Sequence, residues 1–405
     1  MAERDLTDEA TYDRVRLDRR TLLRMAAVAT ASVPLWTPGT AGAEPGPIVK
    51  PLPADTFVVH GTNAETRWEA LADVGDLVPA GRFFVRNHTR TPLLSADTWR
   101  LRLFGTGLRG TPTAGNPVEF TYQDLLDLPA RTITARIECA GNGRSFFTSQ
   151  QNQTVSGTPW GLGAVGVARW RGVPLAAVLD RAGLRRTAVD VLPQGLDPHY
   201  VTGGVDLGPV RCPLPVAKAL KDVLVAYEMN GEPLPPDHGF PVRLVVPDWI
   251  GIASVKWLGS IEVSDTPLTS PWNTQYYRFF GPGYPADGEP LGPQNTKSAF
   301  ELPWHATLAA GRTHHLTGRS WSGTGGVRRV EVSTDGRTWR PAIPRGHDRT
   351  GWYRWSFPWR PSGTGAYTLR ARATDRTGVP QPAVARYNTQ GYLFGAVVDH
   401  PVTVV

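Results

Sequence analysis

The chain has 405 residues, of which 40% are hydrophobic and 20% are charged. At roughly 150 residues per domain this length allows two or three domains, and the sequence holds no apolar run of about 18 residues that would span a membrane. The 43 Gly and 37 Pro, with 14 Trp, 13 Phe and 11 Tyr, indicate turn-rich β structure around aromatic cores. The formal net charge is +7, but the sequence has no run of five or more basic residues, so we expect no nucleic-acid partner.

The N-terminus has the pattern of an export signal. Residues 18–24 read Asp-Arg-Arg-Thr-Leu-Leu-Arg, an apolar stretch covers residues 25–36, and Ala41-Gly42-Ala43 fits a cleavage site. We interpret residues 1–43 as a twin-arginine signal peptide and expect a periplasmic, cell-envelope or extracellular protein without a membrane anchor. A charged surface helix is the alternative. Because this route exports folded proteins, the pattern favours a protein that carries a cofactor.

Strand and helix patterns then alternate along the chain. The expected strands cover residues 82–86, 98–104, 132–139 and 242–246. The expected helices cover residues 121–128, opened by Thr121 with an acid three residues on, and residues 175–182. This mixture predicts an α+β fold. After about residue 300, alternating apolar residues and a hairpin turn at Asp335-Gly336 predict an immunoglobulin-like β-sandwich, with residues 281–294 as the linker.

Three short segments concentrate residues that can do chemistry. At the end of one expected strand, Cys139 enters a loop with Gly141 and Gly143, which permit close backbone approach to a ligand. A buried structural thiol is the alternative there. Arg86 and His88 fall on one side of another expected strand end. A further His and Arg surround a glycine in residues 237–243. The only other cysteine is Cys212, so one disulfide at most is possible, and a covalent haem needing C-x-x-C-H is excluded from this sequence.

Together and in this order the segments resemble the sulfite oxidase family of molybdopterin enzymes. The resemblance runs from about residue 80 to the C-terminus and rests on Phe84-Val85-Arg86-Asn87-His88, Glu138-Cys139-Ala140-Gly141-Asn142, Gly163-Ala164-Val165-Gly166 with Ala168-Arg169-Trp170, Ala226-Tyr227-Glu228-Met229-Asn230-Gly231, Asp237 to Arg243, and Ser254-Val255-Lys256-Trp257.

The resemblance implies a molybdenum held by the pterin dithiolene and by the thiolate of Cys139, because a soft metal centre is matched to sulfur. It implies that the cofactor is bound by Phe84, Arg86, Asn87, His88, Cys139, Asp197, His238, Arg243, Ser254, Val255 and Lys256. Around the substrate anion it places Arg86, Arg144 and Tyr277, with Cys139, as the catalytic set.

Two positions depart from the family pattern. The acid that usually precedes the tyrosine is Tyr276 here, and the arginine usually contributed by the C-terminal domain is Gln390, in the run Tyr387 to Gly391. Oxidation of sulfite to sulfate is the leading expectation, with electrons passed to a separate carrier such as a cytochrome c. Reduction of S-oxides or N-oxides, including protein methionine sulfoxide, is the enzyme alternative. A non-catalytic binding module and a cysteine hydrolase are further alternatives, although nothing in the sequence places a base beside the thiol.

By the same resemblance, residues 44–290 form the molybdopterin-binding domain and residues 291–405 an immunoglobulin-like domain that forms a homodimer. Trp and Tyr in residues 352–359 suit either the dimer surface or the core of that domain.

Overall fold

Strands make up most of the regular secondary structure in the described chain, which comprises residues 46–345 and 351–405 of a computed structural model. The predicted signal peptide lies outside these residues. The α-helices that the structure describes are short: α2 (Tyr122–Leu126), α3 (Ser145–Ser149), α4 (Leu175–Arg181), α5 (Val216–Lys221) and α6 (Pro271–Thr274). Single turns of 3-10 helix cover Trp68–Leu71, Ala80–Arg82, Pro236–His238 and Gly251–Ala253. The α+β prediction therefore holds as a strand-rich fold with few helices. No helix within the described ranges is both long and apolar enough to cross a bilayer.

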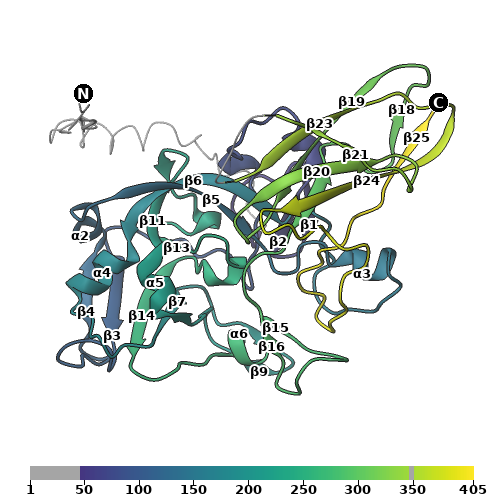
Figure 1. The fold of residues 1–405 in the computed structure, drawn as a ribbon. Helices are drawn as coiled ribbons and strands as arrows, with labels where there is room; N and C mark the ends of the chain where they lie inside the picture. The colour runs from purple at the N-terminus through teal and green to yellow at the C-terminus, as the bar shows by residue number, and fades with distance from the viewer. Residues whose placement is uncertain (1–45, 346–350) are drawn as a thin grey trace, which may run out of the picture. The chain divides into compact units, whose positions relative to one another are not determined.

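Two sheets build the part of the fold before residue 290 (Figure 1). One has the strand order β10 (Leu214–Pro215), β7 (Asp190–Gly195), β14 (Leu258–Ser264), β3 (Arg100–Phe104) and β4 (Val118–Thr121). The other has the order β12 (Glu232–Pro233), β11 (Leu224–Met229), β6 (Val165–Pro174) and β5 (Arg131–Glu138), and β13 (Arg243–Val245) also pairs with β11. Short hairpins complete this part: β1 (Phe57–His60) with β2 (Asn63–Thr66), β8 (Val201–Thr202) with β9 (Val205–Asp206), and β15 (Arg278–Phe279) with β16 (Glu289–Pro290).

The second sheet brings two of the expected chemical segments to the same region. Antiparallel β5 and β6 pair along all of β5, from Arg131 opposite Gly172 to Glu138 opposite Val165. Cys139 therefore leaves the end of a strand that is fixed over its whole length. Arg243 begins β13, where it lies opposite Ala226 of β11.

Local signals placed several elements correctly. Thr121 caps α2: its side chain accepts a hydrogen bond from the backbone of Asp124, whose carboxylate accepts one from the backbone of Thr121. This reciprocal capping is what the Thr and the acid three residues on predicted. Helix α4 and strands β3, β5 and β13 also confirm the expected segments within a few residues.

The expected strand over residues 82–86 is wrong. A 3-10 turn occupies Ala80–Arg82, and Val85 forms only an isolated bridge with Ala64. Alternation fails here because Phe83 and Phe84 are both buried and their rings stack with centroids 5.3 Å apart. Neighbouring side chains that are both buried do not fit the two-sided pattern of a strand.

The C-terminal part is a sandwich of two sheets. One has the order β17 (Lys297–Phe300), β19 (His314–Trp321), β23 (Tyr353–Trp359) and β22 (Ile343–Pro344). The other has the order β18 (Ala306–Leu308), β25 (His400–Val404), β24 (Gly365–Asp375), β20 (Val327–Ser333) and β21 (Arg340–Pro341). Residues of both sheets share one hydrophobic cluster, which defines the sandwich. The tryptophans of residues 352–359 are buried, so they belong to cores of this protein. The division at residue 290 and the immunoglobulin-like description stay predictions.

Candidate active site

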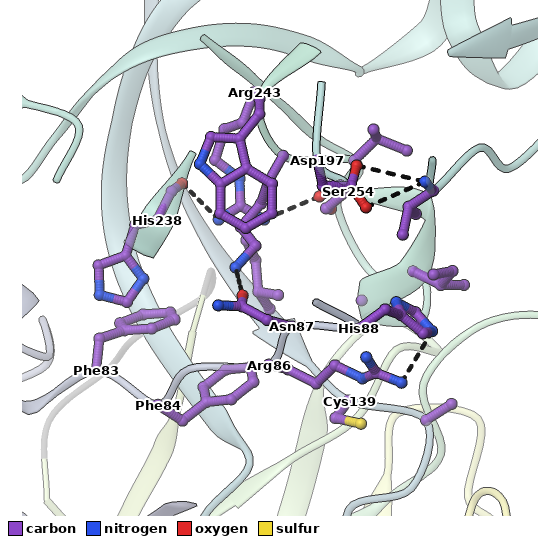
Figure 2. Close-up of a pocket in the computed structure, with 18 of the residues that line it drawn as sticks. Phe83, Phe84, Arg86, Asn87, His88, Cys139, Asp197, His238, Arg243 and Ser254 are labelled. Atoms are coloured by element: carbon purple, nitrogen blue, oxygen red, sulfur yellow. Dashed lines mark hydrogen bonds between the residues drawn. The ribbon is translucent and has the colours of Figure 1, made fainter. Parts of the chain in front are cut away.

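The predicted cofactor-binding residues, which came from segments far apart in the sequence, line a single pocket (Figure 2). Tyr277 lines it as well. Arg144 lies in an adjoining pocket, which also has Arg86, His88, Cys139 and Tyr277 in its wall. The structure therefore brings every predicted site residue to one of two adjoining pockets that share the thiol.

A tight turn presents the Cys139 thiol to both pockets. The turn closes through a hydrogen bond of 2.9 Å from the backbone N–H of Asn142 to the carbonyl of Cys139. The backbone N–H of Gly141 points at the sulfur, with nitrogen 3.4 Å from Sγ. A Cβ at position 141 would lie 2.7 Å from the guanidinium of Arg144, so a larger residue there would displace that side chain. Cys139 is 8% exposed, so its thiol is available to a ligand in the pocket but shielded from bulk water.

The segment before β3 supplies a paired Arg and His. As expected, Arg86 and His88 point the same way: Arg86 Nη2 lies 3.0 Å from His88 Nε2. Trp272 Nε1 donates to the same imidazole nitrogen at 3.2 Å. Because two donors face Nε2, we assign the proton of the neutral ring to Nδ1. Burial lowers the pKa of His88 well below its usual value, and the charges of Arg86 and Lys256 lower it further.

Buried cations gather at the other side of the pocket. Arg243 donates to the carbonyls of His238 at 3.0 Å and Ser254 at 2.9 Å, and burial lowers its pKa to about 9. Lys256 donates to Asn87 and to the carbonyl of Asp237, and burial lowers its pKa well below the usual value. Their hydrogen bonds within the described chain go to neutral oxygens. Asp197 lies in the same wall, where its carboxylate accepts from the backbone N–H of Val210.

This donor set fits a molybdopterin. A buried guanidinium and a buried ammonium that bond only to neutral oxygens carry charge that a phosphate would compensate. The pocket that holds them extends to the sulfur of Cys139, the ligand that molybdenum requires. His238, Arg243, Ser254, Val255 and Lys256 would then surround the phosphate end of the group, and Cys139 would hold the metal.

The adjoining pocket has the character of an anion site. Tyr277 is buried in a left-handed backbone conformation, with φ of 56°, and its hydroxyl accepts from Arg86 Nη2 at 3.4 Å. Its ring stacks on Tyr392 with centroids 5.2 Å apart. Burial raises the pKa of Tyr277, so the phenol keeps its proton. A left-handed tyrosine is costly, and the surrounding contacts hold it at this position in the pocket.

Arg144 is fixed by the chain around it. Its Nε donates to the carbonyl of Gln390 at 2.9 Å and its Nη1 to the carbonyl of Thr158, also at 2.9 Å. The guanidinium carbon lies 5.3 Å from the centre of the Tyr392 ring. The side chain of Gln390 donates to the carbonyl of Gln275, while its Oε1 is buried without a hydrogen-bond partner in the described chain. The two departures from the family pattern, Tyr276 and Gln390, thus both line the anion pocket.

Sequence reasoning missed the aromatic wall of this pocket. Trp160, Tyr200 and Tyr392 line it beside Cys139 and Arg144. Tyr392 directly follows the run from Tyr387 to Gly391 that the family resemblance had marked, so its position next to that run could have indicated it. Trp160 precedes the Gly163 block by three residues, and Tyr200 follows Asp197 at the same spacing. Their roles depend on the loops between elements, for which the sequence carried no periodic signal.

The comparisons with known proteins agree with this geometry. The profile of the family described as the oxidoreductase molybdopterin binding domain matches residues 88–272. Human mitochondrial sulfite oxidase is 35% identical over 357 residues, covering 82% of this chain and 63% of that protein. Chicken sulfite oxidase is 38% identical over 298 residues, covering 69% of this chain and 61% of that protein. The chain belongs to the sulfite oxidase family.

Other relatives show how widely this family fold is used. The sulfane dehydrogenase SoxCD from Paracoccus pantotrophus has a solved structure that superposes with a TM-score of 0.69, at 28% identity and with 83% of each chain covered. The NADH nitrate reductase of Ulva prolifera is 32% identical over 368 residues, covering 82% of this chain and 41% of that protein. The chain spans about three fifths of the length of the sulfite oxidases it matches. As a member of the family it has the molybdenum–molybdopterin cofactor.

The two buried histidines predict how the cofactor-free protein responds to pH. Burial lowers the pKa values of His88 and His238 well below 6.5, and neighbouring cations lower them further. Unfolding therefore takes up a proton at each ring once the pH falls below about 6.5. We expect the free energy of unfolding to decrease between pH 7 and pH 5, by up to about 1.4 kcal/mol per pH unit for each histidine.

Urea unfolding followed by intrinsic fluorescence at several pH values measures this slope. His238→Gln should reduce it, whereas His199→Gln, a change at an exposed histidine that forms an ion pair with Asp206, should leave it in place. A stability that is flat from pH 7 to pH 5 would contradict the neutral state of both buried rings.

Proposed function

We propose that this chain is an exported molybdenum oxidoreductase that oxidises sulfite to sulfate and passes the electrons to a separate carrier such as a cytochrome c. The observation that carries the proposal is the Cys139 thiol, which faces both the pocket of buried cations and the pocket of Arg86, Arg144 and Tyr277. In balanced form, sulfite and water give sulfate, two protons and two electrons. The family resemblance and the sulfite oxidases among the relatives support the substrate.

Each residue of the anion pocket has a separate role in binding or orienting the substrate. When bound, the cofactor supplies the molybdenum centre that accepts two electrons. Arg86 and Arg144 attract the oxyanion and orient it, since fixed guanidinium groups in a shielded pocket act more strongly than in water. Tyr277 keeps its proton and donates a hydrogen bond to an oxygen of the substrate. His88, held neutral, keeps Arg86 in place through its Nε2.

The substrate assignment is tested with cofactor-loaded protein. Sulfite should reduce ferricyanide or cytochrome c at a saturable rate. The same assay should also test nitrate as the electron acceptor, because a nitrate reductase is among the relatives. No turnover of sulfite by protein that contains stoichiometric molybdenum would contradict the proposal.

Arg86 is expected to act mainly on substrate binding. Replacing it by Gln removes one charge-assisted hydrogen bond, worth about 1.5–3 kcal/mol, so the KM for sulfite should rise by roughly tenfold or more. The KM for a neutral sulfoxide should change far less. Steady-state kinetics on both substrates measure the difference. Arg82→Gln, a change at a more exposed arginine paired with Asp73, is the control. An unchanged KM for sulfite would remove Arg86 from the anion site.

A second function, reduction of an S-oxide or N-oxide, is favoured by the composition of the same pocket. Gln390 stands where the family pattern has an arginine, and its Oε1 has no hydrogen-bond partner among the residues that the structure describes; Tyr276 stands where the pattern has an acid. Without that further arginine the pocket has fewer cations for a dianion, while Arg86 and Arg144 can still donate to the oxygen of an uncharged oxide. Dye-driven reduction of sulfoxides that exceeds sulfite oxidation would favour this second function.

Export and assembly belong to the same proposal. Residues 1–43, as a twin-arginine signal, would deliver the folded protein to the periplasm, the cell envelope or the medium. The C-terminal sandwich would form the contact of a homodimer. Fractionation of cells that express the full chain, and light scattering of the purified protein, test the two parts separately.

A further inference from the structure

The strand that ends at Cys139 is held by residues from the C-terminal part of the chain. Arg136 and Glu138 lie two residues apart on β5 and therefore on the same face. Arg136 Nε donates to Gln294 Oε1 at 2.6 Å, and its other nitrogens donate to the carbonyls of Gly351 at 2.7 Å and Ser322 at 3.0 Å. Residues from the C-terminal part of the chain therefore hold β5 at Arg136, three residues before the thiol.

Glu138, the residue next to the thiol, is held more tightly still. Its carboxylate accepts from Lys297 Nζ at 2.6 Å, and both side chains are 1% exposed. Trp321 Nε1 donates to the second carboxylate oxygen at 2.9 Å. Asn142 Nδ2 donates to the first at 2.9 Å. Lys297 begins β17 and Trp321 ends β19, so two sandwich strands meet this carboxylate.

The same lysine also holds the far end of the Cys139 turn. Lys297 Nζ donates to the carbonyl of Asn142 at 2.9 Å. The side-chain oxygen of Asn142 accepts from the backbone N–H of Ala164 at 3.0 Å, which ties the turn to the start of β6. One ammonium therefore fixes the residue before Cys139 and the residue that closes the turn. Between them lies the N–H of Gly141 that faces Sγ.

We propose that the buried Lys297–Glu138 pair is a positioning pair for the metal ligand. It sets the direction of the Cys139 sulfur and keeps the Gly141 N–H aimed at it, so that the C-terminal sandwich forms part of the molybdenum site. Hydrogen bonds to a coordinating sulfur and the groups that orient it tune the properties of a metal. The inference rests on the proposed role of Cys139 as the ligand.

A merely structural ion pair is the competing explanation. Breaking a buried pair on one side destabilises any fold, whereas replacing both partners by neutral groups is often tolerated. The chain contains a matched control: Arg319 and Glu301 form a second buried pair in the same sandwich, 2.5 Å apart, with 0% and 2% exposed side chains. Arg319 donates to carbonyls of residues 71–75, and none of its hydrogen bonds within the described residues reaches the Cys139 turn.

The experiment compares Lys297→Met and the double variant Glu138→Gln/Lys297→Met with Arg319→Met and Glu301→Gln/Arg319→Met. In cofactor-free protein at one fixed pH, the alkylation rate of Cys139 by iodoacetamide is followed by peptide mass spectrometry. This separates Cys139 from Cys212, whose buried thiol has its pKa raised to about 12. In cofactor-loaded protein, the Mo(V) electron paramagnetic resonance spectrum and kcat are recorded.

We expect both Lys297 variants to change the alkylation rate of Cys139 about threefold or more, to shift the Mo(V) g-values, and to lower kcat by about 10- to 100-fold. The Arg319 variants should lose stability but keep all three signals. If Lys297→Met does not fold, the comparison is made with the neutral double variant Glu138→Gln/Lys297→Met alone. Lys297 variants that match their Arg319 counterparts in alkylation rate and spectrum would overturn the proposal. If the native chain binds no molybdenum, the proposed function fails, and the cofactor-free alkylation comparison still tests the positioning.

Discussion

Replacing Cys139 by Ser is expected to abolish molybdenum-dependent turnover while the chain still folds. A serine hydroxyl is a poor substitute for the thiolate that a soft metal centre selects. Cys139 lies where a hydrophobic cluster meets the pocket, and serine has nearly the same size, so the replacement leaves the packing of that cluster largely in place. Because second-shell changes alone cost about 10- to 100-fold, loss of the ligand itself should cost more than about 100-fold in kcat.

Three measurements check this prediction: sulfite turnover, molybdenum content by mass spectrometry, and thermal unfolding. Cys212→Ser is the matched control, because this second thiol is equally buried but packs in the core formed around β7 and β14. It should keep full molybdenum content and activity. Retained turnover in the Cys139→Ser protein would exclude the thiolate as a metal ligand.

Replacing Arg243 by Met is the second change with a large expected effect, and it should act on cofactor retention. Arg243 is 4% exposed and bonds only to carbonyl oxygens in the described chain, so its charge is directed at the pocket. Loss of a hydrogen bond between this guanidinium and a phosphate removes about 1.5–3 kcal/mol of binding. We therefore expect cofactor affinity to fall by roughly 10- to 100-fold.

The ratio of molybdenum to protein after dilution and gel filtration measures retention. Arg169→Met changes an exposed arginine of the same sheet and should keep the native ratio. The pH at which retention is lost is informative too. Burial lowers the pKa of Arg243 to about 9, and because a bound anion stabilises the charged guanidinium, the native protein should stay loaded above that pH. Full occupancy in the Arg243→Met protein would place the phosphate elsewhere.

How much of this could be predicted from the sequence depends on the range of each interaction. Thr121 and Asp124 are three residues apart, and their capping of α2 is a local signal. The alternation of Leu369, Ala371 and Ala373 along β24 is equally local, and all three are buried as a one-sided strand predicts. The site residues came instead from blocks resembling a family, and the structure brings these blocks together.

What could not be predicted depends on partners distant in the chain. Lys297 has no local pattern that marks it as buried, yet it meets Glu138 across 159 positions. Phe83 and Phe84 looked like part of a strand, but the stacking of their rings and the burial of both override alternation. The left-handed Tyr277 likewise has no sequence signal, because only the surrounding pocket makes that backbone conformation tolerable.

The contacts between the C-terminal part of the chain and β5 have an evolutionary consequence. If the first 290 residues were inherited without the rest, Glu138 would lose the ammonium of Lys297, and Arg136 would lose its hydrogen bond to Gln294. A buried carboxylate would then lie beside the thiol without its ammonium partner. Recombination that exchanges the C-terminal module between relatives must therefore bring along a lysine at the start of its first strand, or lose the acid that precedes the cysteine.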